Sequence, residues 1–321
     1  MLRILSLVIA LTMTLSATVR IEKVNYKGWP NSYKITNGEV ELVVVGDIGP
    51  RIMRYALVGG QNLFKEYPET LGKSGETTWI IRGGHRLWRA PEDQVLSYGL
   101  DNGPVAIEVK GDVLTATGPV EKTTGLQKQI VVKLASTGSG VEVIHRLKNT
   151  NRQPLEFAAW ALTVMAPGGV MITDFPPRGK HPDVLPPTNP LTMWAYTDFS
   201  DSRWHFTKKY LTLKQDPKAK EPQKVALFNP ETWGAYLLGS DLFVKRYQAD
   251  PKRQYPDFGC SLATFTNADM LEVETLGPLT KVASGASVEH TERWSLHKNV
   301  RIPAWTDAAL DKAVLPLVVG K

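Results

Sequence analysis

Hydrophobic and polar residues alternate in short segments along most of this chain, and this alternation limits the fold more than any other feature. The clearest segments cover residues 271–276 (LEVETL) and 287–296 (SVEHTERWSL), with Gly285 in the turn between them. A period of two residues is typical of β-strands, because successive side chains point to opposite faces of a sheet. About fifteen or more such segments follow one another, separated by short turns.

Helical patterns are rare by comparison. The one clear helical segment, residues 307–315, stands near the end of the chain with Thr306 as its expected N-cap. A parallel sheet would need a crossover helix between successive strands, and the sequence has no such repeated helices. We therefore predict a large all-β sandwich, with a β-propeller as the second choice.

The first eighteen residues have the pattern of a secretory signal peptide. Met1-Leu2-Arg3 gives a cationic start, followed by an apolar run over residues 4–15 and the small residues Ser16 and Ala17. Cys260 is the single cysteine, so the chain cannot form an internal disulfide. We expect an exported bacterial protein, periplasmic or extracellular, with no stable membrane span after cleavage. A membrane anchor or a buried N-terminal strand is the alternative.

The mature chain is expected to form one domain. We predict a single β domain over residues 19–300 and a helix and tail over residues 301–321. Within the domain, residues 166–223 contain nine prolines and seven aromatic residues. A long irregular stretch with so many aromatic residues is more typical of a functional excursion than of a linker.

Charge and motifs exclude several classes of function. The net charge is +6 with a pI near 9.2, and a local excess of lysines at residues 208–224 is expected to be a solvated loop. An exported protein rarely meets nucleic acid, so the charge points to anionic glycans or the envelope surface. The sequence has no motif of a zinc site, a serine hydrolase or a dinucleotide site, and we predict no metal and no cofactor.

Two glutamates on one expected strand are candidates for acid–base chemistry. Glu272 and Glu274 are two residues apart, so both side chains lie on the same face, opposite Leu271, Val273 and Thr275. In a concave site, burial and mutual repulsion would separate their pKa values and provide a general base. The alternative is a strand face exposed to solvent.

A second candidate segment follows Gly83-Gly84. His85, Arg86, Trp88, Arg89 and Glu92 lie within eight residues. Histidine can act as an acid or base near neutral pH, arginine binds carboxylates or hydroxyl pairs, and tryptophan stacks on sugars. The alternative is a turn held by an Arg–Glu salt bridge, with Trp88 in the core.

Several of these segments together resemble the galactose mutarotase-like superfamily. The resemblance rests on residues 41–55 with Gly49-Pro50-Arg51-Ile52, on residues 143–160 with Lys148-Asn149-Thr150-Asn151, and on residues 272–275. Within that superfamily, residues 83–92 and 289–294 look most like an uncharacterised family of exported bacterial proteins. The likeness covers roughly residues 38–298.

The resemblance implies a β-supersandwich of two large antiparallel sheets, with a sugar site on a concave face. It places the general base of an aldose 1-epimerase at Glu274, while the position of the partner acid falls on Trp160, which cannot donate a proton in that way. His85 is the expected substitute acid. The substrate-binding residues implied by the likeness and by the patterns above are Arg51, Arg86, Trp88, Glu92, Trp160 and Glu272.

We thus predict a carbohydrate-binding protein that acts on a hexose or uronate as an aldose 1-epimerase-like isomerase if the site is catalytic. A sugar-binding module without catalysis is the first alternative, favoured by Trp160 at the acid position. An envelope scaffold that uses the proline-rich excursion as a protein interface is the second.

Overall fold

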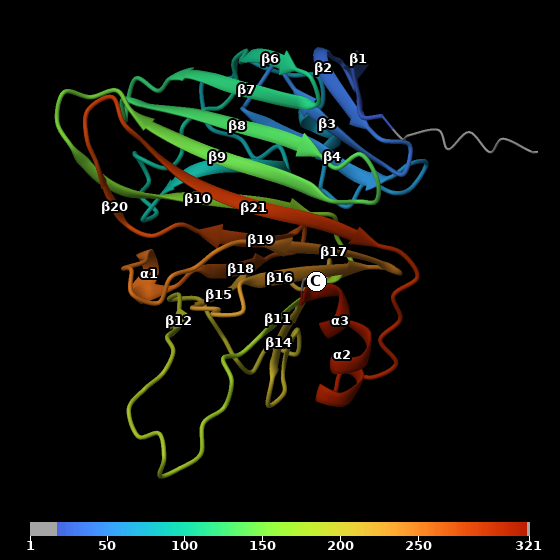
Figure 1. Ribbon diagram of the computed structural model, residues 1–321, viewed down its shortest axis with the longest axis vertical. Helices are drawn as coiled ribbons and strands as arrows, with labels where there is room; N and C mark the ends of the chain where they lie inside the picture. Colours follow the sequence, from blue (N-terminus) through green and yellow to red (C-terminus); the bar gives the residue numbers. More distant parts are fainter. Residues whose placement is uncertain (1–17, 320–321) are drawn as a thin grey trace, which may run out of the picture.

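The computed structural model describes residues 18–319, and in this part of the chain two large antiparallel sheets pack against each other (Figure 1). The first sheet has the strand order β1 (Arg20–Tyr26), β2 (Trp29–Thr36), β3 (Val40–Val45), β4 (Arg51–Leu57), β5 (Gly84–Ala90), β10 (Leu155–Met165), β19 (Leu271–Leu276), β18 (Leu262–Thr266), β15 (Gln223–Leu227) and β12 (Leu191–Met193), while β20 (Thr280–Val282) pairs with β10.

The second sheet has the order β13 (Trp204–Phe206), β14 (Tyr210–Lys214), β11 (Val170–Asp174), β16 (Trp233–Leu238), β17 (Asp241–Arg246), β21 (Ser287–His297), β9 (Val141–Asn149), β8 (Leu126–Leu134), β7 (Val113–Val120) and β6 (Ala106–Lys110). The helices are short: a 3₁₀ turn (Pro68–Thr70), α1 (Pro256–Gly259), α2 (Asp307–Ala313) and α3 (Leu315–Val318). The predicted all-β sandwich with a short C-terminal helix is confirmed.

The main core lies between the two sheets. Tyr55 and Phe64 reach it from the side of the first sheet, and Phe243 and Trp294 from the second, with ring centroids 5.6–6.3 Å apart. All four side chains are almost completely buried. Burying one side chain of this size stabilises the fold by about 1.5–3 kcal/mol, so these four rings hold the sheets together.

The C-terminal helix covers the outer face of the second sheet. Thr306 is its N-cap, since its hydroxyl accepts a hydrogen bond from the Ala309 amide. Leu310 and Val314 pack with Trp233 of β16 in a small hydrophobic cluster. The predicted helix over residues 307–315 is therefore interrupted after Ala313 but has the expected cap.

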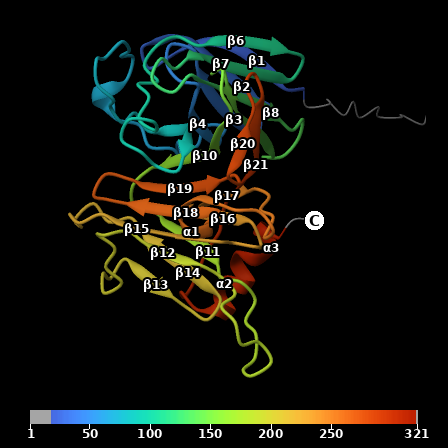
Figure 2. The same cartoon turned by 90° about the vertical axis from the view of Figure 1, so that its left-hand side faces the viewer.

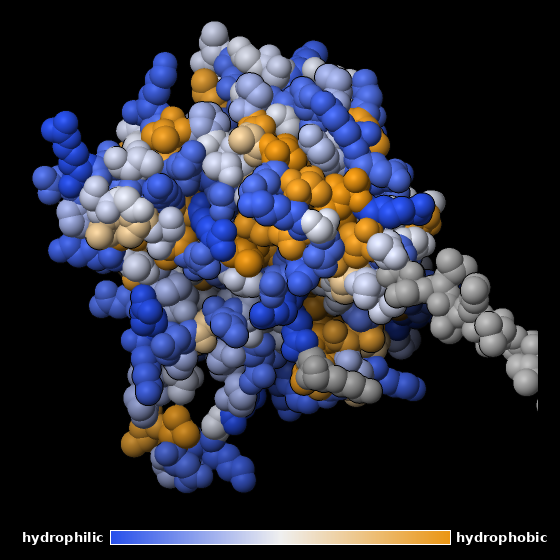
Figure 3. Space-filling model, turned by 45° about the horizontal axis from the view of Figure 1, so that its top comes forward, coloured by the Kyte–Doolittle hydropathy of each residue, from blue (hydrophilic) through white to orange (hydrophobic). Residues whose placement is uncertain are grey.

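The proline-rich stretch differs from the expectation of one long irregular excursion. Residues 166–223 contain β11 to β14 and the first residue of β15, so strands of both sheets pass through it. The irregular part is mainly the connection between β11 and β12, which projects from the body of the molecule (Figures 1 and 2). Hydrophobic side chains are exposed near its end, among them Val184 and Leu185 (Figure 3). Residues 79–81 are irregular.

The predicted signal peptide, residues 1–18, lies outside the described residues except for Thr18. Among residues 18–319 there is no helix that combines the length and the apolar character needed to cross a membrane.

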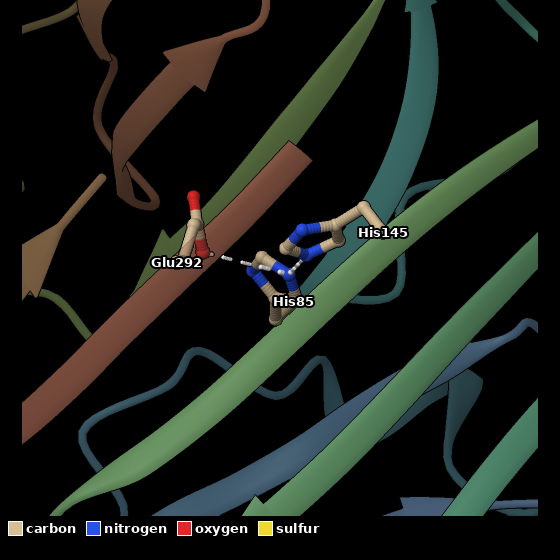
Figure 4. Close-up of side chains that lie close together, drawn as sticks. All are labelled: His85, His145 and Glu292. Atoms are coloured by element: carbon tan, nitrogen blue, oxygen red, sulfur yellow. Dashed lines mark hydrogen bonds and ion pairs between the residues drawn. The ribbon is translucent and has the colours of Figure 1, made fainter. Parts of the chain in front are cut away.

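A buried polar network joins the two sheets (Figure 4). His85 of β5 contacts His145 of β9 through their Nε2 atoms at 2.6 Å, and His145 Nδ1 lies 2.8 Å from the His290 carbonyl oxygen. A carbonyl only accepts, so His145 carries its proton on Nδ1 and accepts at Nε2 from His85. The Thr163 hydroxyl, 2.8 Å from His85 Nδ1, then donates to His85. Every ring nitrogen of His85 and His145 has a partner while both rings are neutral.

Beside the histidines lies a buried ion pair. Glu292 of β21 accepts from Lys245 of β17 at 2.9 Å and from the Trp294 indole at 2.8 Å. Both charged side chains are fully buried. A buried carboxylate is tolerated only when it is paired and hydrogen-bonded, so this pair is tied to the packing of the two sheets.

The histidines of this network make stability sensitive to acid. Burial lowers the pKa of His85, His145 and His290 below 6.5, and for His290 to about 3. The unfolded chain therefore binds protons below pH 6.5 that the folded protein excludes, and stability present at neutral pH is lost as the pH falls. Each such histidine contributes a slope of up to about 1.4 kcal/mol per pH unit.

We expect His290→Gln to reduce this slope, measured as the free energy of unfolding in urea between pH 6.5 and 4.5. His181→Gln, at an exposed position, serves as the control. Identical slopes for the wild type and His290→Gln would show that the buried histidine does not resist protonation.

Candidate functional site

The outer face of the first sheet carries a cavity of about 230 Å³. It lies over β5, β10, β19, β18 and β15, on the side of these strands that faces away from the second sheet. Its lining combines aromatic and charged side chains, namely Trp79, Trp88, Tyr98, Trp160, Tyr196, Phe265, Arg86, Glu92, Lys224 and Glu272, with Ile81, Leu162, Asn267 and Met270 between them. Aromatic walls with a few charged groups are typical of a binding site for a small polar ligand.

Strand register places the lining residues on one face. Leu162 of β10 is opposite Arg86 of β5 on one side and opposite Glu274 of β19 on the other. Trp160 is likewise opposite Trp88. Residues directly opposite on antiparallel strands point to the same face, so the arginine, the tryptophans and the glutamate share the cavity side.

Two glycines fix the start of β5. Gly83 and Gly84 have φ angles of +76° and +67°. A Cβ atom on Gly83 would lie 2.0 Å from the Lys65 carbonyl oxygen, and one on Gly84 would lie 2.6 Å from that of Ile52. The backbone therefore passes close to its neighbours here, which only glycine allows.

Glu274 lies behind the cavity wall. The Trp160 indole donates to its Oε2 at 2.9 Å, Lys224 Nζ lies 3.4 Å from the same oxygen, and Oε1 has no partner although it is buried. Burial raises the pKa of Glu274 to about 7, against the opposing effect of Lys224 and with the help of Glu272 and Glu92. A carboxyl group with this pKa can both give and take a proton near neutral pH.

Lys224 is the cation of this part of the site. Its ammonium lies 4.9 Å from the centre of the Trp160 ring and 4.7 Å from that of Trp194, and 3.8 Å from Glu92. Burial lowers its pKa, but Glu274, Glu92 and Glu272 outweigh burial, so the pKa is raised and the side chain stays charged. The distances to Glu274 and Glu92 exceed those of direct hydrogen bonds, which leaves Lys224 able to donate to a ligand oxygen.

Glu272 and Arg86 form a second charged pair. Arg86 Nη2 donates to Glu272 at 3.0 Å, and the guanidinium lies over the Trp88 ring at 4.5 Å from its centre. The partner of Arg86 is thus Glu272 from a distant strand and not Glu92, the partner in the alternative of a local turn.

The structure brings together most, but not all, of the residues predicted from the sequence. Five of them line the cavity: Arg86, Trp88, Glu92, Trp160 and Glu272. Glu274 is buried directly behind Trp160 and Lys224. Arg51 is buried next to Arg86 on β4 and donates to the Gly83 carbonyl.

His85 is placed differently from the expectation. Adjacent residues of a strand point to opposite faces, so when Arg86 faces the cavity, His85 faces the second sheet, where it contacts His145 and Thr163. It therefore lies on the other side of the sheet from the cavity and does not approach it as a partner acid.

Sequence reasoning did not find Lys224, Tyr98 or Tyr196. Lys224 belongs to the lysine-rich segment that we expected to be solvated. The apolar residues 225–228, which follow Lys224 directly, could have indicated its burial. A lysine at the start of a buried strand is not part of a free loop.

A metal ion needs several histidine, cysteine, aspartate or glutamate side chains close together. Among residues 18–319 one such group occurs, His85, His145 and Glu292, whose potential metal-binding atoms all lie within 4.8 Å of one another. The two histidine Nε2 atoms are 2.6 Å apart, whereas two nitrogens on one tetrahedral ion stand roughly 3.3 Å apart. Lys245 also holds Glu292 and adds a positive charge. The cluster thus fits a shared proton better than an ion.

No family model and no curated protein matches the sequence. Among solved structures, the chain is similar to a putative aldose 1-epimerase from Klebsiella pneumoniae, with a TM-score of 0.59 and 11% identity over 94% of this chain and 88% of that one. It is also similar to a galactose mutarotase-like protein from Lactobacillus casei, with a TM-score of 0.55 and 12% identity over 82% and 99%.

A third similar structure is a galactose mutarotase-related enzyme from Lactobacillus acidophilus, with a TM-score of 0.53 and 9% identity over 84% and 98% of the two chains. Together these likenesses show that the chain has the galactose mutarotase-like fold. The resemblance drawn from the sequence is confirmed at this level, while the narrower likeness to an exported bacterial family stays a prediction.

The pair of Lys224 and Glu274 can be tested by titration. We expect Lys224→Met to raise the pKa of Glu274 above 7, because the nearest cation favours the ionised carboxylate and its loss favours the protonated form. Infrared spectroscopy of the carboxyl band, assigned with Glu274→Gln, would measure the shift. Lys209→Met, which removes the partner of Asp311 near the C-terminal helix, is the control. An unchanged pKa in Lys224→Met would contradict the assignment.

Proposed function

We propose that the cavity binds a single sugar unit and that Glu274 acts on it as a general acid–base group. The chemistry closest to the site is that of an aldose 1-epimerase, in which a base removes the proton of the anomeric hydroxyl and the ring opens and closes again. The observation that carries the proposal is the place of Glu274, buried beside the cavity against Trp160 and Lys224 with its Oε1 unpaired. Burial raises the pKa of this carboxyl group to about 7, which suits transfer of a proton near neutral pH.

The cavity supports a sugar as ligand in size and in chemistry. Its volume of about 230 Å³ is below the range of roughly 300–1,000 Å³ usual for drug-sized ligands, which suits one sugar ring. Trp88 and Trp160 give the cavity apolar walls, and Arg86 and Lys224, which lie over their rings, can bind sugar hydroxyls.

In this proposal Lys224 takes part of the role that a histidine acid would have. Its charged ammonium donates a hydrogen bond to the ring oxygen and so stabilises negative charge there as the ring opens. Its raised pKa makes full proton transfer slow, so Glu274 carries the proton that moves.

A binding module without catalysis is the second candidate. It is favoured by one observation: the side chain of Glu274 is fully buried behind Trp160, which uses its indole N–H to hold the carboxylate. A sugar would have to displace Trp160, or reach Oε1 from the side of Lys224, before the carboxylate could act on it.

Exchange between sugar anomers separates the two candidates. We expect the protein to accelerate the exchange of a hexose or a uronate, measured by NMR magnetisation transfer, and Glu274→Gln to reduce that acceleration by about 10²–10⁴-fold. The matched control is Glu289→Gln, which removes a half-exposed glutamate from the second sheet.

Calorimetry with the same sugars completes the test. Binding of a sugar without faster anomer exchange would support the binding module and reject the epimerase-like function. An absence of both for hexoses and for uronates would overturn the proposed function altogether.

A further inference from the structure

Two arginines face each other at the edge of the cavity. Arg51 of β4 is directly opposite Arg86 of β5 in the strand register, and both side chains are almost completely buried. Like charges directly opposite each other on neighbouring strands repel, and burial strengthens the repulsion because little water screens it. An arrangement of this kind calls for an anion.

A third buried arginine lies at the same place. Arg82 precedes Gly83 and pairs with Glu76, and only 1% of its surface is exposed. Burial lowers the pKa of Arg51 to about 9, and the charges of Arg86 and Arg82 act in the same direction. The charge of Asp101 opposes this effect. The guanidinium groups of Arg86 and Arg82 thus both act on that of Arg51, and the three form a cluster.

The cluster has N–H groups that the protein does not use. Five buried nitrogen atoms have no hydrogen-bond partner: Arg51 Nε, Arg82 Nε and Nη1, and Arg86 Nε and Nη1. Buried donors without partners are rare and costly, and donors on a charged group are the most costly to leave unpaired. Of the three arginines, Arg86 is the one that lines the cavity, so a bound ligand lies beside its guanidinium group.

The acidic residues around the cluster limit the charge of an anion that can bind beside it. Arg82 pairs with Glu76 and Arg86 with Glu272, whereas the Arg51 guanidinium donates to the Gly83 carbonyl. The next acidic residue, Asp101, pairs with Lys128, which also pairs with Glu121. A dianion would place more negative charge beside Glu272 than a singly charged carboxylate does, so the site favours the carboxylate.

We propose that the sugar bound in the cavity carries a carboxylate, as a uronic acid unit does, and that this carboxylate binds at Arg86. The inference rests on the proposed sugar-binding function and names its substrate class. Arg51 and Arg82 lie behind Arg86 and add positive potential at the carboxylate. Lys224 and Glu274, at the other charged part of the cavity, are left for the hydroxyl groups.

Calorimetry at low ionic strength tests this assignment. D-Glucuronate and D-galacturonate are compared with their neutral counterparts, D-glucose and D-galactose, and with D-glucose 6-phosphate as the dianion. We expect each uronate to bind at least about tenfold more tightly than its neutral counterpart, the usual gain from a charge-assisted hydrogen bond.

Substitution of Arg51 tests whether the arginine cluster causes the preference for uronates. Arg51→Gln should reduce the preference for uronates over their neutral counterparts by about tenfold. The matched control is Arg54→Gln, which removes an arginine of the same strand that is bound to Glu41 and to the Gly60 carbonyl. If Arg51→Gln does not fold, the comparison of uronates with neutral sugars on the wild type decides alone.

Three results would overturn the inference. Equal affinity for uronates and neutral sugars would remove the carboxylate site and leave the proposed sugar-binding function standing. Tighter binding of D-glucose 6-phosphate than of either uronate would show that the site is made for a dianion and not for a carboxylate. Binding of none of these compounds would reject the inference and the proposed function together.

Discussion

The molecule depends on the pairing of β10 with β5 on one side and with β19 on the other. These three strands are buried on both faces. Neighbouring residues along each strand therefore contribute to two different parts of the molecule. One face forms the polar and aromatic contacts between the sheets, and the opposite face forms the wall of the cavity. Because side chains alternate strictly along a strand, the core and the site are built by the same few residues and cannot vary independently.

Two buried ion pairs follow from this arrangement. Lys245 pairs with Glu292 between the sheets, and Lys224 lies beside Glu274 under the cavity. The first pair has short hydrogen bonds on every side, as a structural pair requires. The second is looser and leaves one carboxylate oxygen without a partner. The difference between a satisfied and an unsatisfied buried pair distinguishes the structural cluster from the candidate site, although both contain a lysine and a glutamate.

Much of the fold could be predicted from the sequence, because it depends on local periodicity. The alternation in residues 271–276 places Glu272 and Glu274 on one face, and the structure has them there. The same rule, applied to residues 84–90, places His85 and Arg86 on opposite faces. The sequence does not tell which of these two faces is the core, since histidine, arginine and tryptophan occur in both surroundings.

The contacts that could not be predicted from the sequence are those between residues far apart in the chain. The partner of Arg86 is Glu272, 186 positions away, and the contact of His85 with His145 joins two sheets. Lys224 has neighbours of both signs in the sequence, and only the packing of Trp160 and Trp194 around it removes it from solvent. Such contacts come from the arrangement of the sheets and leave no periodic signal.

The glycines at the start of β5 have a consequence for how this protein can change. Gly83 and Gly84 hold the strand so close to Lys65 and Ile52 that its starting point cannot move. Insertion or deletion of one residue between Gly84 and Trp88 would exchange the two faces of the strand, bringing an imidazole to the ligand and a guanidinium into the interior. Evolution of new specificity in such a chain must therefore proceed by replacement at fixed positions along β5, with length changes confined to the loops around the rim.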